Sequence, residues 1–114
     1  MQELFCLNGK IRDFESVIIY GAGSAGQIML LKLLQHNVKV ECMTDSDPDK
    51  CGVKFLNIPI IHIDAIEDKH ESAVIVSGVY AFEVAKELEK RGFHQLFFDY
   101  GNEVNIIHLS REDE

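Results

Sequence analysis

Short apolar runs, separated by polar or glycine-containing stretches, divide this chain into strand-like segments. Runs rich in β-branched and aromatic residues predict buried strands over residues 16–20, 38–44, 73–77 and 95–100. A further extended run covers residues 55–61 and contains Pro59. Proline has no backbone donor, so we expect this strand to be short, bulged or at a sheet edge. In the strand over 38–44, strict alternation places Val40 and Cys42 on one face and Glu41 and Met43 on the other.

Two longer segments have the spacing of helices. The first starts near residue 24 or 25 and ends at about residue 35, and its inward stripe is predicted to be Ile28, Leu31 and Leu34, widened by Leu30 and Leu33. The second covers residues 80–91 and stops at Gly92, a residue type that commonly ends helices. Residues 63–70 have room for one or two helical turns.

Apolar strands that alternate with helices predict an α/β fold. A parallel sheet buried on both faces by helices accounts for strands this apolar. Right-handed crossovers favour a Rossmann-like doubly wound sheet of about five strands in the order 3-2-1-4-5. We assign one domain to residues 16–109, a lead-in to residues 1–15 and an acidic tail to residues 110–114.

The turn between the first strand and the first helix is rich in glycine and reads Gly21-Ala22-Gly23-Ser24-Ala25-Gly26. In a dinucleotide-binding turn, Gly21 permits the tight bend, Gly23 lets the backbone approach a diphosphate, and Gly26 lets the helix lie close to the strand. Free amides at the helix start then bind phosphate oxygens. The alternative is a tight strand–helix turn that binds nothing.

Two further positions are assigned to the same site. Asp45 follows the second strand, where a dinucleotide fold places an acid that accepts hydrogen bonds from a ribose. No lysine or arginine adjoins Asp45, so NAD is favoured over NADP; the alternative is an exposed turn acid. Ser77 and Gly78 follow the fourth strand and should face the glycine turn across a crevice, or else form an ordinary strand-to-helix turn.

Composition and charge narrow the classes of partner. The 114 residues are 46% apolar, enough for one sizeable core, and the net charge of −8 argues against general affinity for nucleic acid or anionic membranes. With no basic cluster, an anionic ligand should be bound by backbone amides. No apolar run reaches the roughly 20 residues that span a bilayer, and the first ten residues lack a secretory pattern. We expect a cytoplasmic protein, without membrane insertion, whose cysteines are reduced.

The residues after the glycine turn resemble a known family. The order is Asp45-Ser46-Asp47-Pro48-Asp49-Lys50-Cys51-Gly52, followed by Ile58-Pro59-Ile60. This resembles the Rossmann-like domain of bacterial polysaccharide-biosynthesis proteins, found in nucleotide-sugar epimerase/dehydratases and in sialic-acid-type sugar O-acetyltransferases. The resemblance covers residues 16–100 and implies binding of NAD or a nucleotide-sugar. It implies phosphate contacts from Gly21, Gly23, Ser24, Ala25 and Gly26, and a ribose or base contact from Asp45. Asn57 departs from the glycine common there.

Sets of catalytic residues are not apparent. A short-chain dehydrogenase needs a tyrosine with a lysine four residues later, whereas Tyr80 has Val84 there. The five histidines lack metal-binding spacing; His62 with Asp64 resembles an acid–base pair, but such neighbours are more often a solvated loop contact. We therefore predict neither catalytic nor metal-binding residues.

The function expected from the sequence is a nucleotide-binding domain of a sugar- or polysaccharide-biosynthesis system, without catalysis of its own. One alternative is the cofactor-binding half of an NAD-dependent oxidoreductase or nucleotide-sugar dehydratase. Another is a ligand-free protein-interaction domain. The expected partners are a small nucleotide ligand and either a second copy of the chain or a separate catalytic domain, with no nucleic acid.

Overall fold

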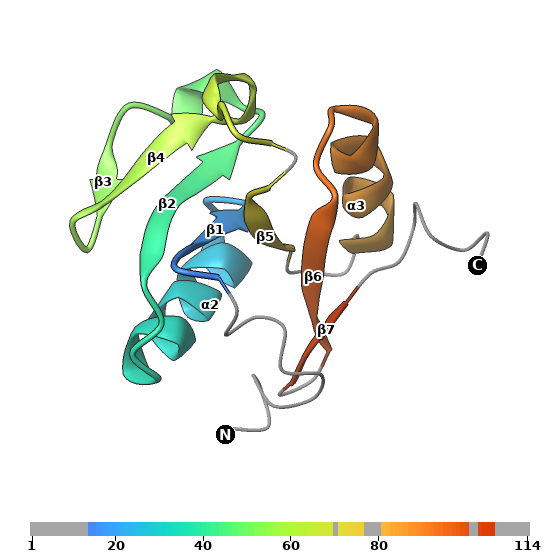
Figure 1. The fold of residues 1–114 in the computed structure, drawn as a ribbon. Coiled ribbons are helices and arrows are strands. Elements are labelled where there is room, and N and C mark those ends of the chain that lie inside the picture. The colour runs from blue at the N-terminus through green and yellow to red at the C-terminus, as the bar shows by residue number, and fades with distance from the viewer. Residues whose placement is uncertain (1–13, 70, 77–80, 101–102, 107–114) are drawn as a thin grey trace.

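The structure is a computed structural model that describes residues 14–69, 71–76, 81–100 and 103–106, and it is an α/β fold with one mixed, mostly parallel sheet (Figure 1). The strands are β1 (Val17–Tyr20), β2 (Val40–Asp45), β3 (Lys54–Phe55), β4 (Ile58–His62), β5 (Ala73–Val76), β6 (Gln95–Tyr100) and β7 (Glu103–Ile106). The helical elements are α2 (Ser24–Gln35), α3 (Ala81–Lys90) and the short 3₁₀ turns η2 (Pro48–Lys50) and η3 (Ile63–Ala65).

The seven described strands lie in the order β3-β4-β2-β1-β5-β6-β7. β4, β2, β1, β5 and β6 run parallel, whereas β3 and β7 pair antiparallel with β4 and β6 at the two edges. The order of the whole sheet therefore differs from the predicted 3-2-1-4-5, because hairpins extend both edges. At one edge, Leu56 and Asn57 both have positive φ (53° and 67°), as the tightest hairpin turns require. The run over 55–61 is thus a turn and strand rather than one strand.

A register shift in β2 changes which residues face each helix. Val17 pairs with Val40, but Ile18 pairs with Cys42, so Glu41 has no partner of its own in β1. The extra residue reverses the alternation. Val40 and Met43 therefore share one face of the sheet, and Cys42 lies on the other. The predicted alternation, which grouped Val40 with Cys42, is wrong for this reason.

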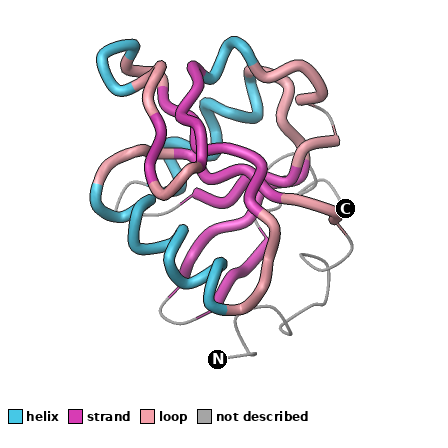
Figure 2. Tube along the Cα trace, turned by 90° about the vertical axis from the view of Figure 1, so that its left-hand side faces the viewer, coloured by secondary structure: helices cyan, strands magenta, loops and turns pink. Residues whose placement is uncertain are grey.

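One helix covers each face of the sheet. The core on the α2 side (Figure 2) comprises buried residues of α2 and of five strands: Met29, Leu30, Leu33, Val17, Ile19, Val40, Met43, Ile60, Ala73, Ile75 and Phe97, with Ala22. The core on the α3 side comprises Ala85, Leu88, Phe93, Ile18, Cys42, Val74, Val76 and Leu96, with Ile63 and Ile66. Alternate residues of β1 and β5 divide between the two cores, which explains why these strands are apolar throughout.

The inward stripe predicted for α2 is wrong at its three central positions and right at Leu30 and Leu33, the two residues that were expected to widen it. Ile28, Leu31 and Leu34 are 55%, 46% and 39% exposed, and the buried positions are Gly26, Met29, Leu30 and Leu33. These four are spaced i, i+3, i+4 and i+7, so they form one helix face as regular as the predicted stripe.

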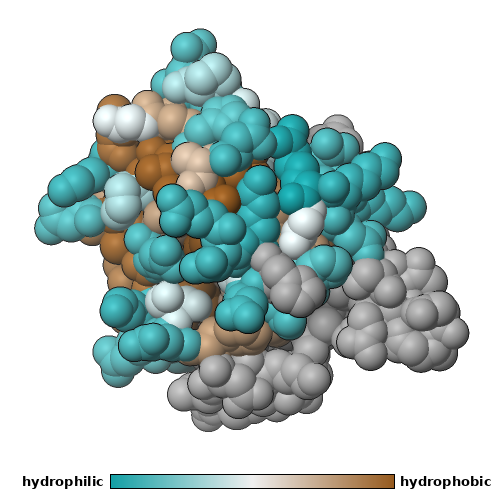
Figure 3. Space-filling view, turned by 45° about the horizontal axis from the view of Figure 1, so that its top comes forward, coloured by the Kyte–Doolittle hydropathy of each residue, from teal (hydrophilic) through white to brown (hydrophobic). Residues whose placement is uncertain are grey.

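On the side shown in Figure 3, apolar residues gather at the left, where Figure 1 has β2, β3, β4 and α2. None of the helices in the described residues is long and apolar enough to cross a membrane.

Candidate functional site

The glycine turn has the geometry that its sequence predicts at two of its three glycines. Gly21 has φ of +102°, a conformation that strongly favours glycine, and its N–H donates to the Thr44 carbonyl oxygen at 2.7 Å. Gly26 lies so close to the turn that a Cβ there would be 1.8 Å from the Gly21 carbonyl oxygen. The absence of a side chain at Gly26 therefore allows α2 to start directly against the end of β1.

The start of α2 offers hydrogen-bond donors that have no acceptor among the described residues. Gly23 is the N-cap, no side chain caps the helix, and no acidic residue lies in its first turn. The first turn-closing bond runs from the Gln27 N–H to the Gly23 carbonyl at 3.0 Å. The N–H groups of Ser24, Ala25 and Gly26 come before that bond and have no partner within an α-helix. They form the positive end of the helix dipole and suit an anion.

Gly23 faces open space. Apart from the residues adjoining Gly23 in the chain, the one described atom within 4 Å of a Cβ built there is Nζ of Lys50, at 4.0 Å. Its φ of −83° and ψ of −162° are open to any residue type, so the backbone does not require glycine there. The missing side chain instead keeps the space beside the helix start empty. Sequence reasoning missed Lys50, because it is five residues beyond Asp45 and only the folded loop returns it to the turn.

Asp45 lies beside the glycine turn, as predicted, and is only 8% exposed. One carboxylate oxygen accepts the Ala22 N–H at 2.9 Å, and the other accepts the Asp47 N–H at 3.0 Å. The side chain therefore ties the glycine turn to the loop after β2. The expectation of an exposed turn acid does not fit this burial. Each oxygen keeps a second lone pair, and a ribose contact stays a prediction.

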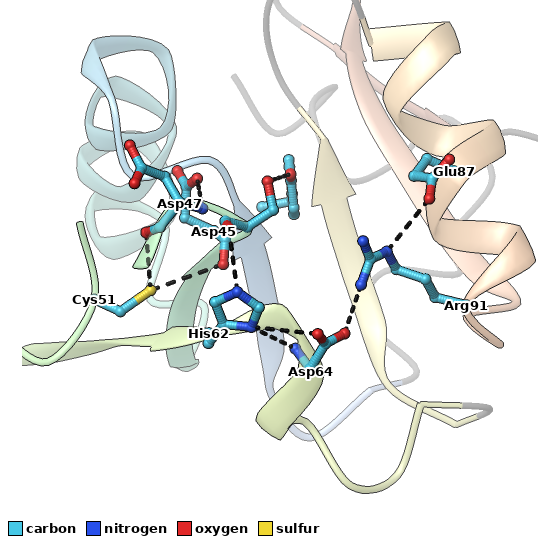
Figure 4. A network of polar contacts seen from close by, with 9 residues as sticks. Asp45, Asp47, Cys51, His62, Asp64, Glu87 and Arg91 are labelled. Carbon is cyan, nitrogen blue, oxygen red and sulfur yellow. Dashed lines mark hydrogen bonds and ion pairs between the residues drawn. The ribbon is translucent and has the colours of Figure 1, made fainter. Parts of the chain in front are cut away.

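The loop after β2 is organised by its own side chains (Figure 4). The Asp47 carboxylate accepts the Asp49 N–H at 3.0 Å and caps η2, whose first residue is proline. The Cys51 thiol lies 3.4 Å from the Asp47 carbonyl oxygen and 3.8 Å from that of Asp45. Burial, together with the Asp45 and Asp47 carboxylates, raises the pKa of the Cys51 thiol. This thiol is therefore a hydrogen-bond donor rather than an activated nucleophile.

A second hollow lies on the α3 side of the sheet, at the ends of β1 and β2. It is a cavity of about 190 Å³ lined by Tyr20, Ser46, Glu83, Val84, Glu87, Leu88 and Arg91. The Tyr20 hydroxyl is 3.2 Å from the Ser46 hydroxyl. Arg91, one of the lining residues, forms ion pairs with Asp64 and Glu87. The lining combines the apolar side chains of Val84 and Leu88 and the Tyr20 ring with the polar groups of Ser46, Glu83, Glu87 and Arg91.

His62 and Asp64 form a local contact that belongs to this polar network (Figure 4). The Nδ1 atom of His62 accepts the Asp64 N–H at 3.1 Å and caps η3. Its Nε2 atom lies 3.1 Å from the Ser46 carbonyl oxygen, which only accepts, so the proton resides on Nε2. With both ring nitrogens occupied, His62 is a loop contact rather than a general base.

Ser77 and Gly78 lie outside the described residues, so their predicted place in the site stays a prediction. Val76, the last residue of β5, pairs with Tyr20 at the end of β1. The last described residue of β5 therefore lies beside the last residue of β1, which precedes the glycine turn. Among the described residues, no group of three or more His, Cys, Asp or Glu side chains is arranged to hold a metal ion.

The chain is similar to a redox-sensing transcriptional repressor, Rex, of Anoxybacillus flavithermus (strain DSM 21510 / WK1). The two are 29% identical over 77 residues, which cover 66% of this chain and 36% of Rex. The chain thus corresponds to about a third of the length of that relative. A relative named as a transcriptional repressor contradicts our expectation that nucleic acid is not a partner, and we withdraw that expectation.

The resemblance to polysaccharide-biosynthesis domains stays a prediction, because the match to Rex does not concern those proteins. No solved structure matches the chain significantly. The family described as "C2185-like, N-terminal" matches residues 14–95, which is more than half of the chain and includes the glycine turn, Asp45 and Lys50. The chain therefore belongs to the C2185-like, N-terminal family.

Proposed function

We propose that this chain binds a nucleotide that contains a diphosphate, with NAD(H) as the preferred ligand. The observation that carries the proposal is the uncapped start of α2 beside the open face of Gly23. The N–H groups of Ser24, Ala25 and Gly26 and the positive end of the helix dipole lie beside a space that no described residue fills. A diphosphate supplies the negative charge and the acceptor oxygens that these donors lack.

Asp45 supports a ribose-containing ligand. It lies directly beside the turn because it accepts the Ala22 N–H, one residue before Gly23. A ribose attached to a diphosphate at Gly23 would come within reach of this carboxylate, whose oxygens can each accept one more hydrogen bond. The cavity beside Tyr20 and Val84 has an aromatic and an aliphatic side chain against which a base or nicotinamide ring could pack, and polar groups at Ser46 and Glu83 that could bond to it.

The arrangement of the sheet supports a Rossmann-like fold. Its five parallel strands run β4-β2-β1-β5-β6, with one helix on each face, and the glycine turn follows the central strand β1. In open sheets of this type, ligands bind beyond the carboxyl ends of the central strands. The glycine turn and Asp45 both lie at such ends.

Two similarities favour different nucleotides. The relative Rex is named as redox-sensing, and among dinucleotides NAD(H) is a redox-active choice, so this match favours NAD(H). The order of residues from Asp45 to Ile60 resembles polysaccharide-biosynthesis domains and favours a nucleotide-sugar as the second candidate. Both ligands contain a nucleoside diphosphate, so both use the same glycine turn.

The proposal is tested by isothermal titration calorimetry with NADH, NAD, NADPH and UDP-glucose, supported by thermal shifts. A ligand at about a hundred times its Kd should stabilise the fold by about 2.7 kcal/mol. Gly23→Val should leave the fold nearly intact, with a melting temperature close to the parent's, and lose binding, because the new side chain fills the open space. If the parent protein binds none of the four compounds, or if Gly23→Val binds as well as the parent, the proposal is wrong.

A further inference from the structure

Lys50 places an ammonium group beside the glycine turn. Apart from the residues adjoining Gly23 in the chain, its Nζ atom is the nearest described atom to the point where a Gly23 side chain would begin, at 4.0 Å. A group that enters the open space at Gly23 therefore meets this ammonium first. The same space adjoins the uncapped start of α2, so a cation and a set of amide donors converge on it.

The position of Lys50 is fixed by the loop that carries it. Its N–H donates to the Asp47 carbonyl oxygen at 3.0 Å within η2, and Asp47 in turn donates its N–H to the Asp45 carboxylate. Asp45 is bonded to the Ala22 N–H. A continuous chain of hydrogen bonds therefore connects the backbone of Lys50 to the glycine turn, and the lysine stem starts from a preorganised position.

The neighbouring carboxylates do not neutralise this ammonium. Lys50 follows Asp45, Asp47 and Asp49 in a chain of net charge −8, yet no carboxylate of the described residues forms an ion pair with it. The oxygens of Asp45 accept the Ala22 and Asp47 amides instead. An exposed ammonium that has no carboxylate partner among the described residues and lies beside the positive start of a helix is available to an external anion.

We propose that Lys50 binds the diphosphate of the ligand and makes the site selective for nucleotides over nucleosides. This inference rests on the proposed function, because it assumes a ligand at the glycine turn. It replaces the expectation from sequence that backbone amides alone hold the anion. The phosphate oxygens lie between the α2 amides on one side and the ammonium on the other. Lys50 is a binding residue, and its contribution depends on salt because it is exposed.

The test compares Lys50→Gln with Lys54→Gln; Lys54 is also an exposed lysine, lies on β3 and serves as the matched control. Titration calorimetry measures Kd for NADH, UDP-glucose, NADPH and adenosine at about 0.05 M and 0.5 M salt. We expect Lys50→Gln to bind NADH and UDP-glucose about fivefold to tenfold more weakly at low salt, as an exposed charge pair near 4 Å implies. The loss should shrink at high salt, Lys50→Arg should recover most of the affinity, and adenosine binding should not change.

Each other outcome overturns a defined part of the argument. Equal NADH affinity in Lys50→Gln and the parent overturns the role of Lys50 while leaving the proposed function intact. An equal loss for adenosine shows that Lys50 acts on the fold or the base, and also overturns it. A loss confined to NADPH would assign the ammonium to a 2′-phosphate rather than to the diphosphate. If the parent binds no nucleotide, this inference falls together with the proposed function.

Discussion

Replacing Gly26 by alanine should destabilise the fold, although alanine is the better helix former by about 1 kcal/mol. The new Cβ would lie 1.8 Å from the Gly21 carbonyl oxygen and 2.9 Å from its carbonyl carbon, both backbone atoms. Ordinary contact begins at 3.4 Å, so α2 must move by roughly 1.6 Å relative to the turn. The buried face of α2, including Met29 and Leu30, moves with it.

The size of the effect follows from these contacts. Overpacking of this kind costs about 1–3 kcal/mol. The shift also strains the hydrogen bonds that Gly21 and Ala22 donate to β2, each of which contributes about 1 kcal/mol. After the gain in helix propensity is subtracted, we expect Gly26→Ala to lower the free energy of unfolding by about 2–3 kcal/mol.

Gly23→Ala is the matched control, because it adds the same methyl group three residues earlier. Its backbone angles are open to alanine, and the methyl group enters open space. Alanine lowers the conformational entropy of the unfolded chain, which stabilises the fold, but it is a poorer N-cap than glycine, which destabilises the helix. These two effects oppose each other, so the free energy of unfolding should stay within about 1 kcal/mol of the parent.

Urea unfolding followed by far-ultraviolet circular dichroism measures both variants. A lower midpoint with an unchanged m value is expected for Gly26→Ala alone. If Gly26→Ala unfolds within about 1 kcal/mol of the parent, or if the two variants lose equal stability, the proposed close contact between α2 and the turn does not govern the fold.

Four further predictions test separate parts of the structure. Thr44→Val should raise the free energy of unfolding in urea by about 1 kcal/mol, because the Thr44 hydroxyl is buried without a partner among the described residues; a loss would show that the hydroxyl is bonded. Asp45→Asn should lower it by about 1–3 kcal/mol, because one carboxylate oxygen is replaced by an NH₂ group that faces a donor; no loss would contradict these bonds. Leu30→Ala should cost about 2–5 kcal/mol and Leu31→Ala less than about 1 kcal/mol, whereas the helix face predicted from sequence treats the two alike. Burial, with a smaller contribution from Glu41, raises the pKa of Cys42 to about 12. Peptide mapping after iodoacetamide at pH 8 should therefore find Cys42 unmodified in the native protein. The unfolded thiol ionises near pH 9 and the folded one does not, so stability should fall above pH 9, and less steeply in Cys42→Val.

The sequence predicted the elements of this fold better than their contacts. The spans of α2 and β6 and the α/β class follow from local periodicity, which can be read from the order of apolar and polar residues. The two hairpins at the sheet edges could not be predicted from periodicity. In the hairpin of β3 and β4, for example, β3 has only two residues, and the turn uses Leu56 in a conformation that leucine rarely adopts. The register shift at Glu41 is equally hidden, since it depends on how β2 pairs with β1 rather than on β2 alone.

The candidate site was predictable where a known sequence motif fixes the position of a residue. Gly21 and Asp45 are where the motif places them, but the partners of Asp45 required the loop to be folded. Lys50 carried no signal of its own, because a lysine after three acids looks like a solvated loop charge. The sequence signal that could have indicated its position is Asp47-Pro48, a typical helix cap followed by proline, because the short turn that starts there carries Lys50 to the side of Gly23.

One contact connects the packing of the fold to the geometry of the site. Because Gly26 presses against Gly21, the rotation of α2 is fixed, and residues three, four and seven positions later must face the sheet. The helix could have buried Ile28 and Leu31 with similar gain in apolar area, but only with Gly26 turned away from the strand end. That rotation would also have moved the helix-start amides away from Gly23. The exposed apolar stripe on α2 is thus the consequence of a helix oriented by its first turn, and the first turn is where the ligand is proposed to bind.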